Sequence, residues 1–327
     1  MTKSMISRAG LWIAGIAAGL AVVAVAGLLG LLVLGTRSFP PELKSVSNPM
    51  RGIDFSDLPV LRQFTARDGQ VLSYRVYPGT GPDVVVLIHG SSGESGGMHA
   101  VAKAMNVTGD TIVVPDLRGH GHDGRPGDID YIGQLDDDLA DLVGIIRPAH
   151  PDAKLILAGH SSGGGFVLRI AVGTDAHLFN RFVLLSPVMP YGAVTFRPNI
   201  GGWATPFVGR IVAIKVLNRF GVSWFNFLPV VAFAVNPHAA VPLDATYSYR
   251  MQVNFSAPPD ALERLAALTQ PLAIVIGADD ELFYADRYAP LIHAARQDVP
   301  VTLVTGVNHM GMVTDPRGLS ADVIAIR

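Results

Sequence analysis

Ser161 stands in a pattern of residues that can turn a hydroxyl group into a nucleophile. The segment GHSSG over 159–163 has glycine two residues to either side of this serine. An apolar run over 154–158 precedes the segment, and a helix-like run over 164–170 follows it. Glycines allow the tight strand-to-helix turn that lifts a serine hydroxyl clear of a sheet. The pattern therefore predicts a nucleophile elbow at Ser161.

A second serine, Ser95, stands in the same five-residue pattern, GESGG over 93–97. This segment lies in a loop rich in glycine and serine, several residues past the nearest strand-like run. The pattern by itself has little specificity, so the strand and helix context decides between the two serines. We interpret Ser95 as a loop residue and Ser161 as the nucleophile.

A serine hydroxyl needs a base to take its proton and a carboxylate to orient that base. Downstream of the elbow, the strand-like run 271–276 ends in an acidic pair, Asp279 and Asp280. The next strand-like run is followed by His309 in a glycine-flanked loop. The order Ser, Asp, His, with each residue after a strand, is that of the α/β-hydrolase fold.

These motifs make the chain resemble the α/β-hydrolase superfamily over roughly residues 60 to 327. Within it, the chain resembles the lysophospholipase and monoacylglycerol-lipase-like serine hydrolases. The motifs occur in the family's order: HGSS at 89–92, DLRGHG at 116–121, the elbow at 159–163, GADD at 277–280 and NHMG at 308–311. Because their order and strand context both agree, they are specific as a set.

The resemblance implies a role for each candidate site residue. By it, Ser161 is the nucleophile and His309 is the base. Asp280 is the acid that orients His309, since the family's acid usually stands three residues after the glycine. Asp279 is the alternative acid.

The resemblance also implies an oxyanion site made of backbone N–H groups. Those of Ser91 and Ser162 would bind the oxyanion, whose charge develops in the transition state. It implies no cofactor and no metal ion.

Apolar runs alternate with helix-like runs along most of the chain. A hairpin is predicted over 61–77 around the Asp68-Gly69 turn. Further strands are predicted at 84–88, 111–115, 154–158, 181–185, 271–276 and 300–304, and helices near 94–106, 133–147, 164–173 and 284–297. This alternation predicts an α/β fold with a mostly parallel sheet and helices on both faces. We assign the hydrolase core to 61–187 and 271–327.

Residues 188–270 break this rhythm, and in this position the family inserts a cap over its active site. We expect a helical cap. The segment holds 12 of the chain's 25 aromatic residues, which could line an acyl-chain pocket or form the cap's own core; for most of them we favour the core. From Val188 to Leu243 there are four basic residues and no acidic ones. This balance suits either a surface near anionic lipid or four solvated charges, and the sequence does not choose.

The N-terminal segment 1–36 predicts a membrane anchor. No charge occurs from Ala9 to Thr36, and the apolar run Leu11–Leu34 is long enough to span a bilayer. A cleaved signal peptide is the alternative, but the apolar run continues without a polar cleavage region, which favours an uncleaved anchor. The flanking charges favour a hydrolase domain outside the cytoplasm by a margin of one or two charges.

Residues 37–60 carry four prolines and predict an extended linker. Every candidate catalytic residue lies beyond this linker. We therefore expect residues 1–36 to contribute location rather than catalysis.

Composition narrows the remaining classes. The net charge of −2 argues against nucleic-acid binding, and a chain without cysteine has neither disulfides nor thiolate metal sites. The chain's 327 residues suffice for one large α/β domain with an insertion. Asp136, Asp137, Asp138 and Asp141 look like a metal cluster, but the leucine spacing around them predicts a solvated helix face. For the remaining histidines near the motifs we expect structural hydrogen bonds: His89, His120, His122 and His160.

Together these features predict a membrane-anchored serine hydrolase that cleaves lipid-like or medium-chain carboxylic esters through an acyl-enzyme. A peptidase, thioesterase or acyltransferase would use the same triad. A catalytically inactive binding or scaffold protein at the membrane is the alternative from another class. Labelling by a fluorophosphonate probe, which requires an activated serine, separates the two.

Overall fold

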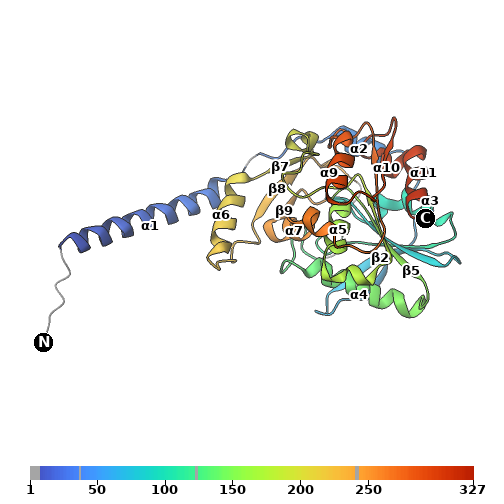
Figure 1. Ribbon diagram of the computed structural model, residues 1–327, viewed down its shortest axis with the longest axis horizontal. Coiled ribbons are helices and arrows are strands. Elements are labelled where there is room, and N and C mark those ends of the chain that lie inside the picture. Colours follow the sequence, from blue (N-terminus) through green and yellow to red (C-terminus); the bar gives the residue numbers. More distant parts are fainter. Residues whose placement is uncertain (1–7, 37, 122–123, 240–242) are drawn as a thin grey trace.

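The computed structural model describes residues 8–36, 38–121, 124–239 and 243–327. A long helix, α1 (Arg8–Leu34), projects from a layered α/β body (Figure 1). The body is built on an eight-stranded sheet in the order β1-β2-β4-β3-β5-β6-β10-β11. Its strands are β1 (Arg62–Thr65), β2 (Val71–Tyr77), β3 (Asp83–Ile88), β4 (Thr111–Pro115), β5 (Lys154–His160), β6 (Arg181–Leu185), β10 (Leu272–Gly277) and β11 (Val301–Val304). From β4 through β11 neighbouring strands are parallel, whereas β2 is antiparallel to β1 and β4.

Both faces of the sheet are buried, which explains why the central strands are continuous apolar runs. In β3, Val84 and Val86 belong to one core cluster, and Val85 and Leu87 belong to another on the opposite face. The first cluster includes residues of α4 (Gln134–Ala149), α5 (Ser162–Ala171), α9 (Tyr288–Ala295) and the cap. The second includes residues of α3 (His99–Asn106), α10 (Gly311–Thr314) and α11 (Pro316–Ala325). The predicted α/β-hydrolase fold is confirmed.

The insertion between β6 and β10 differs from the predicted helical cap, because it also contains a three-stranded antiparallel sheet. Its elements are η3 (Pro198–Gly202), β7 (Ala204–Pro206), α6 (Val208–Arg219), β8 (Pro229–Phe233), β9 (Thr246–Ser248), α7 (Tyr249–Asn254) and α8 (Ala261–Leu265). In β8, the residues Val230, Val231 and Phe233 are of the β-branched and aromatic types that favour strands.

The predicted extended linker over 37–60 is wrong in part, because it contains the short helix α2 (Lys44–Met50). The Leu43 N–H donates a hydrogen bond to the Ala234 carbonyl of the cap at 2.9 Å. Leu43 and Val46 pack against the main core cluster. The segment folds onto the body because its apolar side chains gain contacts there, which its proline content did not reveal.

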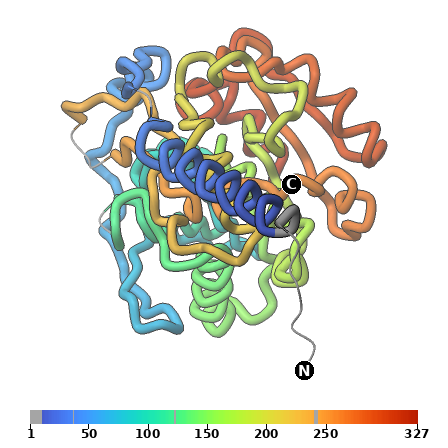
Figure 2. Tube along the Cα trace, turned by 90° about the vertical axis from the view of Figure 1, so that its left-hand side faces the viewer, coloured from blue at the N-terminus to red at the C-terminus, as the bar shows by residue number. Residues whose placement is uncertain are grey.

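Helix α1 has a mean hydropathy of 2.7 over Leu11–Leu34 and is exposed over most of its length. Within the described part of the chain it is the single helix long and apolar enough to cross a membrane. A helix of this kind serves as an anchor or as a signal sequence. Figure 2, viewed from the side on which α1 projects, shows this helix in front of the body.

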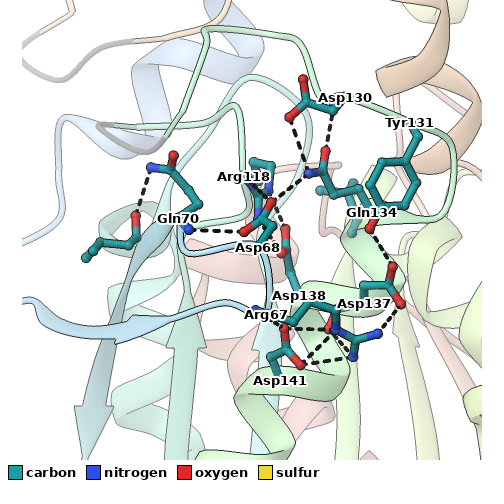
Figure 3. A network of polar contacts seen from close by, with 12 residues as sticks. Arg67, Asp68, Gln70, Arg118, Asp130, Tyr131, Gln134, Asp137, Asp138 and Asp141 are labelled. Carbon is teal, nitrogen blue, oxygen red and sulfur yellow. Dashed lines mark hydrogen bonds and ion pairs between the residues drawn. The ribbon is translucent and has the colours of Figure 1, made fainter.

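The acidic residues of α4 are held by arginines and do not form a plain solvated face. Arg67 pairs with Asp137 at 2.6 Å and with Asp141 at 2.9 Å, while Arg118 pairs with the buried Asp138 at 2.7 Å (Figure 3). These pairs join the β1–β2 turn and the turn after β4 to α4. Among the described residues, no group of three acidic or histidine side chains is arranged to hold a metal ion.

Candidate active site

Ser161 lies at the turn between β5 and α5, in a conformation that few non-glycine residues adopt. Its φ and ψ are 56° and −118°, and such strain is typical of a nucleophile elbow. A Cβ atom on Gly159 would come within 2.5 Å of the Gly163 carbonyl oxygen, and one on Gly163 within 2.4 Å of the His89 carbonyl oxygen. Both positions therefore require glycine.

His309 and Asp280 form a buried pair beside this turn. The His309 Nδ1 atom lies 2.8 Å from Asp280 Oδ2, and both side chains are almost fully buried. Asp280 Oδ1 accepts hydrogen bonds from the backbone N–H groups of Leu282 and Phe283 at 2.9 and 3.0 Å. Asp279, the alternative acid, is exposed.

The surroundings of Asp280 keep its carboxyl group ionised. Burial by itself would raise the pKa of Asp280, but the neighbouring His309 and the hydrogen bonds to the charged form outweigh it and lower the pKa below its usual value. The ionised carboxylate accepts a hydrogen bond from the Nδ1–H group of His309. In a neutral imidazole, a proton on Nδ1 leaves Nε2 without one. This is the tautomer that a general base requires.

Two further residues hold the backbone of His309, and the sequence did not single them out for this role. Glu281 Oε2 accepts the His309 backbone N–H at 3.0 Å, and His160 Nε2 lies 3.2 Å from the His309 carbonyl oxygen. Burial lowers the pKa of His160 to about 3, so its imidazole is neutral and donates to that carbonyl. The sequence signal for these two residues was only their position. Glu281 follows the candidate acid Asp280, and His160 precedes the candidate nucleophile Ser161.

The candidate oxyanion residues come from the start of α5 and from the loop after β3. Ser162 is the first residue of α5, where a backbone N–H has no acceptor within the helix. Ser91 borders the same cavity as Ser161, and its Oγ accepts the Trp203 Nε1–H at 2.9 Å. The neighbouring Gly90 approaches the nucleophile closely, since a Cβ atom there would lie 3.3 Å from Ser161 Cβ.

The cap also holds the residue after Ser91. The Ser92 backbone N–H donates to the Tyr247 hydroxyl at 2.6 Å, and Ser92 Oγ donates to the Asp244 carbonyl at 2.6 Å. Ser92 has a φ of 64°, a strained value that such contacts must maintain. Trp203, Asp244 and Tyr247 are thus cap residues that hold the candidate oxyanion loop, and the sequence showed them only as part of an aromatic-rich insertion.

The other motif histidines make structural hydrogen bonds, as predicted. His120 Nε2 accepts from the Tyr247 hydroxyl at 2.5 Å, and His89 Nε2 accepts the Leu117 N–H at 3.2 Å. Burial lowers the pKa of both imidazoles, which keeps them neutral. His122 lies outside the described residues.

Ser95, in the second five-residue match, has no part in this arrangement. Its Oγ accepts the Arg75 Nε–H at 3.0 Å, and its backbone N–H donates to Asp116 Oδ1 at 2.6 Å. Ser95 is fully buried and begins the short helix η1 (Ser95–Met98) before α3, where a loop was predicted. These contacts make it a structural residue of that helix.

A cavity of about 660 Å³ opens at Ser161 and His309. Its apolar lining comes from three parts of the chain: Val46, Met50, Ile53, Phe55 and Leu58 from the predicted linker; Trp203, Ala234, Val235 and Leu243 from the cap; and Met98, Leu282, Met310 and Val313 from the core. Of the cap's aromatic residues, Trp203 alone is part of this lining. Phe207, Phe233, Tyr247 and Phe255 are buried in the body and cap, as the core interpretation predicts. Tyr191, Phe220, Trp224 and Phe227 are exposed, so that interpretation holds for only part of the cap's aromatic residues.

Comparisons with known proteins agree with this fold. A family model described as serine aminopeptidase, S33, matches residues 82–316. A monoacylglycerol lipase of Mycolicibacterium smegmatis is 28% identical over 264 residues, which cover 75% of this chain and 88% of the relative. A monoglyceride lipase of Rattus norvegicus is 24% identical over 83% of this chain and 89% of its own length. The crystal structure of a monoacylglycerol lipase from Paleococcus ferrophilus matches with a TM-score of 0.60 at 20% identity, over 77% of this chain and 97% of that chain.

The fold and the family match define this chain as an α/β-hydrolase. It belongs to the serine aminopeptidase S33 family, and it is similar to monoacylglycerol lipases.

Proposed function

We propose that this protein hydrolyses carboxylic esters with lipid-like or medium-length acyl chains. The observation that carries the proposal is the buried Asp280–His309 pair beside the strained Ser161, at the base of one largely apolar cavity. Relatives named monoacylglycerol and monoglyceride lipases support the ester assignment.

The proposed reaction follows from the arrangement of these groups. His309 Nε2 takes the proton of Ser161 as its Oγ attacks the ester carbonyl, and Asp280 stabilises the imidazolium that forms. The backbone N–H groups of Ser91 and Ser162 stabilise the oxyanion of the tetrahedral intermediate. The protonated His309 then gives its proton to the departing alcohol. Water, activated by the same imidazole, hydrolyses the acyl-enzyme and restores Ser161.

The cavity sets the proposed substrate class. Apolar side chains make up most of its wall, although Arg51, Arg75 and Glu94 also border it, and its volume of about 660 Å³ accommodates an acyl chain. The apolar part of the wall favours a hydrocarbon chain, because burying an unpaired polar group there is costly.

We further propose that α1 is an uncleaved membrane anchor and that the hydrolase domain lies outside the cytoplasm. The apolar length of Leu11–Leu34 supports the anchor, and the basic residues Lys3 and Arg8 before it support the orientation.

Fluorophosphonate labelling of the full chain tests the catalytic proposal. We expect the native protein to be labelled and Ser161→Ala to lose both labelling and ester hydrolysis. The control is Ser95→Ala, which changes the serine of the second five-residue match and should keep most of both. Labelling that persists in Ser161→Ala would refute the assignment, and a folded native protein that is not labelled would favour the inactive binding protein.

A further inference from the structure

The C-terminal end of α1 is docked on the cap. Leu32 is only 3% exposed and lies in a small apolar cluster with Ala213 and Ile214 of α6 and Val230 of β8. Leu28 packs against the same cluster. The anchor helix therefore ends in a packed joint, which a flexible tether would not provide.

Two glycines and one arginine make this joint close. A Cβ atom on Gly35 would lie 2.7 Å from the Arg210 backbone nitrogen, and one on Gly209 would lie 3.4 Å from Gly35 Cα. The Arg210 side chain, only 9% exposed, donates to the Leu32 carbonyl at 2.8 Å and to the Pro229 carbonyl at 2.7 Å. A cation bonded to the last turn of a helix also interacts favourably with the helix dipole.

The joint fixes where a membrane surface would lie relative to the cap. The apolar span Leu11–Leu34 has 24 residues, so it is about 36 Å long. This length is only slightly greater than the thickness of the hydrocarbon core, which is about 30 Å. The span ends at the joint itself, and α6 lies across the base of α1 (Figure 1). The surface of α6 and the loop after it must then lie at headgroup level.

The exposed residues at this level are those that favour a membrane interface. Phe220 and Trp224, in the loop after α6, are 79% and 80% exposed, and Phe227 is also exposed. Phe225 and Leu228 of the same loop pack into the cluster that holds Leu28 and Leu32, so the loop lies beside the anchor. Exposed aromatic rings of this kind are enriched where membranes meet water.

The exposed face of α6 adds positive charge to these rings. Val208, Val212, Lys215 and Arg219 are exposed at helical spacing, with the two valines followed by the two cations. No acidic residue occurs between Val188 and Leu243. Lysine and arginine beside apolar residues favour contact with anionic headgroups.

We propose that this surface is a second membrane contact, which holds the cap against the bilayer on which α1 is anchored. The lipid-facing patch consists of Val208, Val212, Lys215, Arg219, Phe220, Trp224 and Phe227. The inference rests on the proposed membrane anchoring by α1. Because α1 is packed on the cap, the two contacts together fix how the hydrolase body is oriented on the membrane, from which a lipid-like ester would come.

Single spin labels on the full chain test the patch, because the chain has no cysteine of its own. Cysteine is introduced at Trp224 or Val212, at Ile16 within α1, or at Val107. Val107 is 87% exposed and follows directly after α3. Helix α3 lies on the far side of the body from α1 (Figure 1). Each labelled protein is placed in vesicles of phosphatidylcholine and phosphatidylglycerol, and its accessibility to oxygen and to a water-soluble nickel complex is measured.

We expect the labels at 224 and 212 to favour oxygen, with a smaller preference than the label at 16, and the label at 107 to favour nickel. A label at 16 that is as aqueous as the one at 107 would refute the anchor and, with it, the patch. A membrane-buried label at 16 together with aqueous labels at 224 and 212 would refute the patch alone. Dipolar coupling between labels at 224 on two chains would assign the surface to a second copy and overturn the proposal.

A paired substitution supplies a functional test. In the full chain, Phe220→Ser with Trp224→Ser should lower hydrolysis of a monoacylglycerol in anionic vesicles by about tenfold, since two large apolar contacts with lipid are lost. Hydrolysis of a short water-soluble ester should stay within about twofold, as for a surface change remote from the site. Val107→Ser is the matched control and should change neither rate. Equal rates on the vesicles for the double variant and the native protein would contradict the patch.

Discussion

At the scale of single residues, two buried carboxyl groups near the site respond to their surroundings in opposite ways. Asp280 lies beside His309 and accepts hydrogen bonds to its charged form, so its pKa is lowered despite burial. Asp244 is buried without such partners for its side chain, and burial raises its pKa to about 7. Its backbone, however, holds Ser92 of the oxyanion loop through two hydrogen bonds. Asp244 therefore supports the candidate site through its main chain, while ionisation of its buried carboxyl group at high pH lowers the stability of the fold.

The side chain of Asp244 predicts a pH-dependent gain from Asp244→Asn. An acid whose pKa is raised on folding destabilises the native state progressively as pH rises from its unfolded value, near 4, to about 7. Asparagine does not ionise, so the variant does not lose this stability. Its Tm should be higher than that of the native protein by about 2 °C or more at pH 8. The difference should shrink toward pH 5. Thermal unfolding of both proteins from pH 5 to 8 measures it, and a difference that does not change with pH would contradict the burial argument.

At the scale of elements, the cavity is formed by segments that lie far apart in the sequence. Strands β5, β6, β10 and β11 place the candidate triad at one edge of the sheet, because the carboxyl ends of parallel strands meet there. The cap covers this edge and holds the oxyanion loop through Trp203 and Tyr247. Helix α2 and the residues after it close one wall. A segment that looked like a spacer therefore lines the candidate substrate cavity.

This wall predicts a change of chain-length preference when Met50 of α2 is enlarged. Met50→Trp should fill part of the cavity and raise KM for medium-chain esters by about tenfold, since a methylene or more of acyl contact is lost. Activity on an acetate ester should change little. Asn48→Trp, on the exposed side of the same helix, is the matched control. Initial rates on esters of increasing acyl length test this, and an equal effect on acetate and longer esters would argue that Met50 does not border the acyl site.

At the scale of the whole molecule, α1 and the body form one unit. Helix α1 projects from the body (Figures 1 and 2), yet its last turns are packed on α6. Removal of a flexible tether would leave the surface of the body unchanged. Removal of α1, by contrast, would expose Ala213 and Ile214 of the cap. The packing of α1 and the structure of the cap are therefore coupled.

The anchor predicts that the full-length protein stays with membranes after alkaline carbonate washing. Carbonate removes proteins held by surface charge, but it does not extract a helix of 24 apolar residues from the bilayer. Immunoblotting of the pellet and the supernatant measures how the protein is distributed. The mass of the mature chain shows whether its N-terminal segment is still present. Release of full-length protein would make α1 peripheral, and a chain shortened by its N-terminal segment would make it a signal peptide.

The sequence by itself determined the core sheet, the elbow at Ser161 and the order of the acid and the base. These depend on local signals: apolar runs for buried parallel strands, glycines where no Cβ fits, and motifs just after strands. It favoured Asp280 over Asp279 only through the family's spacing. In the structure the same preference has a physical basis, because Asp280 is buried against His309 while Asp279 faces solvent.

Tertiary structure alone decided what the remaining segments contact. The sequence showed an apolar run, a proline-containing spacer and an aromatic insertion, but not that Leu32 packs on α6, that Met50 lines the cavity or that Tyr247 holds Ser92. These contacts join residues far apart in the chain, and no local period or spacing encodes them. They depend on which apolar surfaces meet once the sheet has formed. The free energy gained by burial depends on the apolar area removed from water and not on position in the sequence.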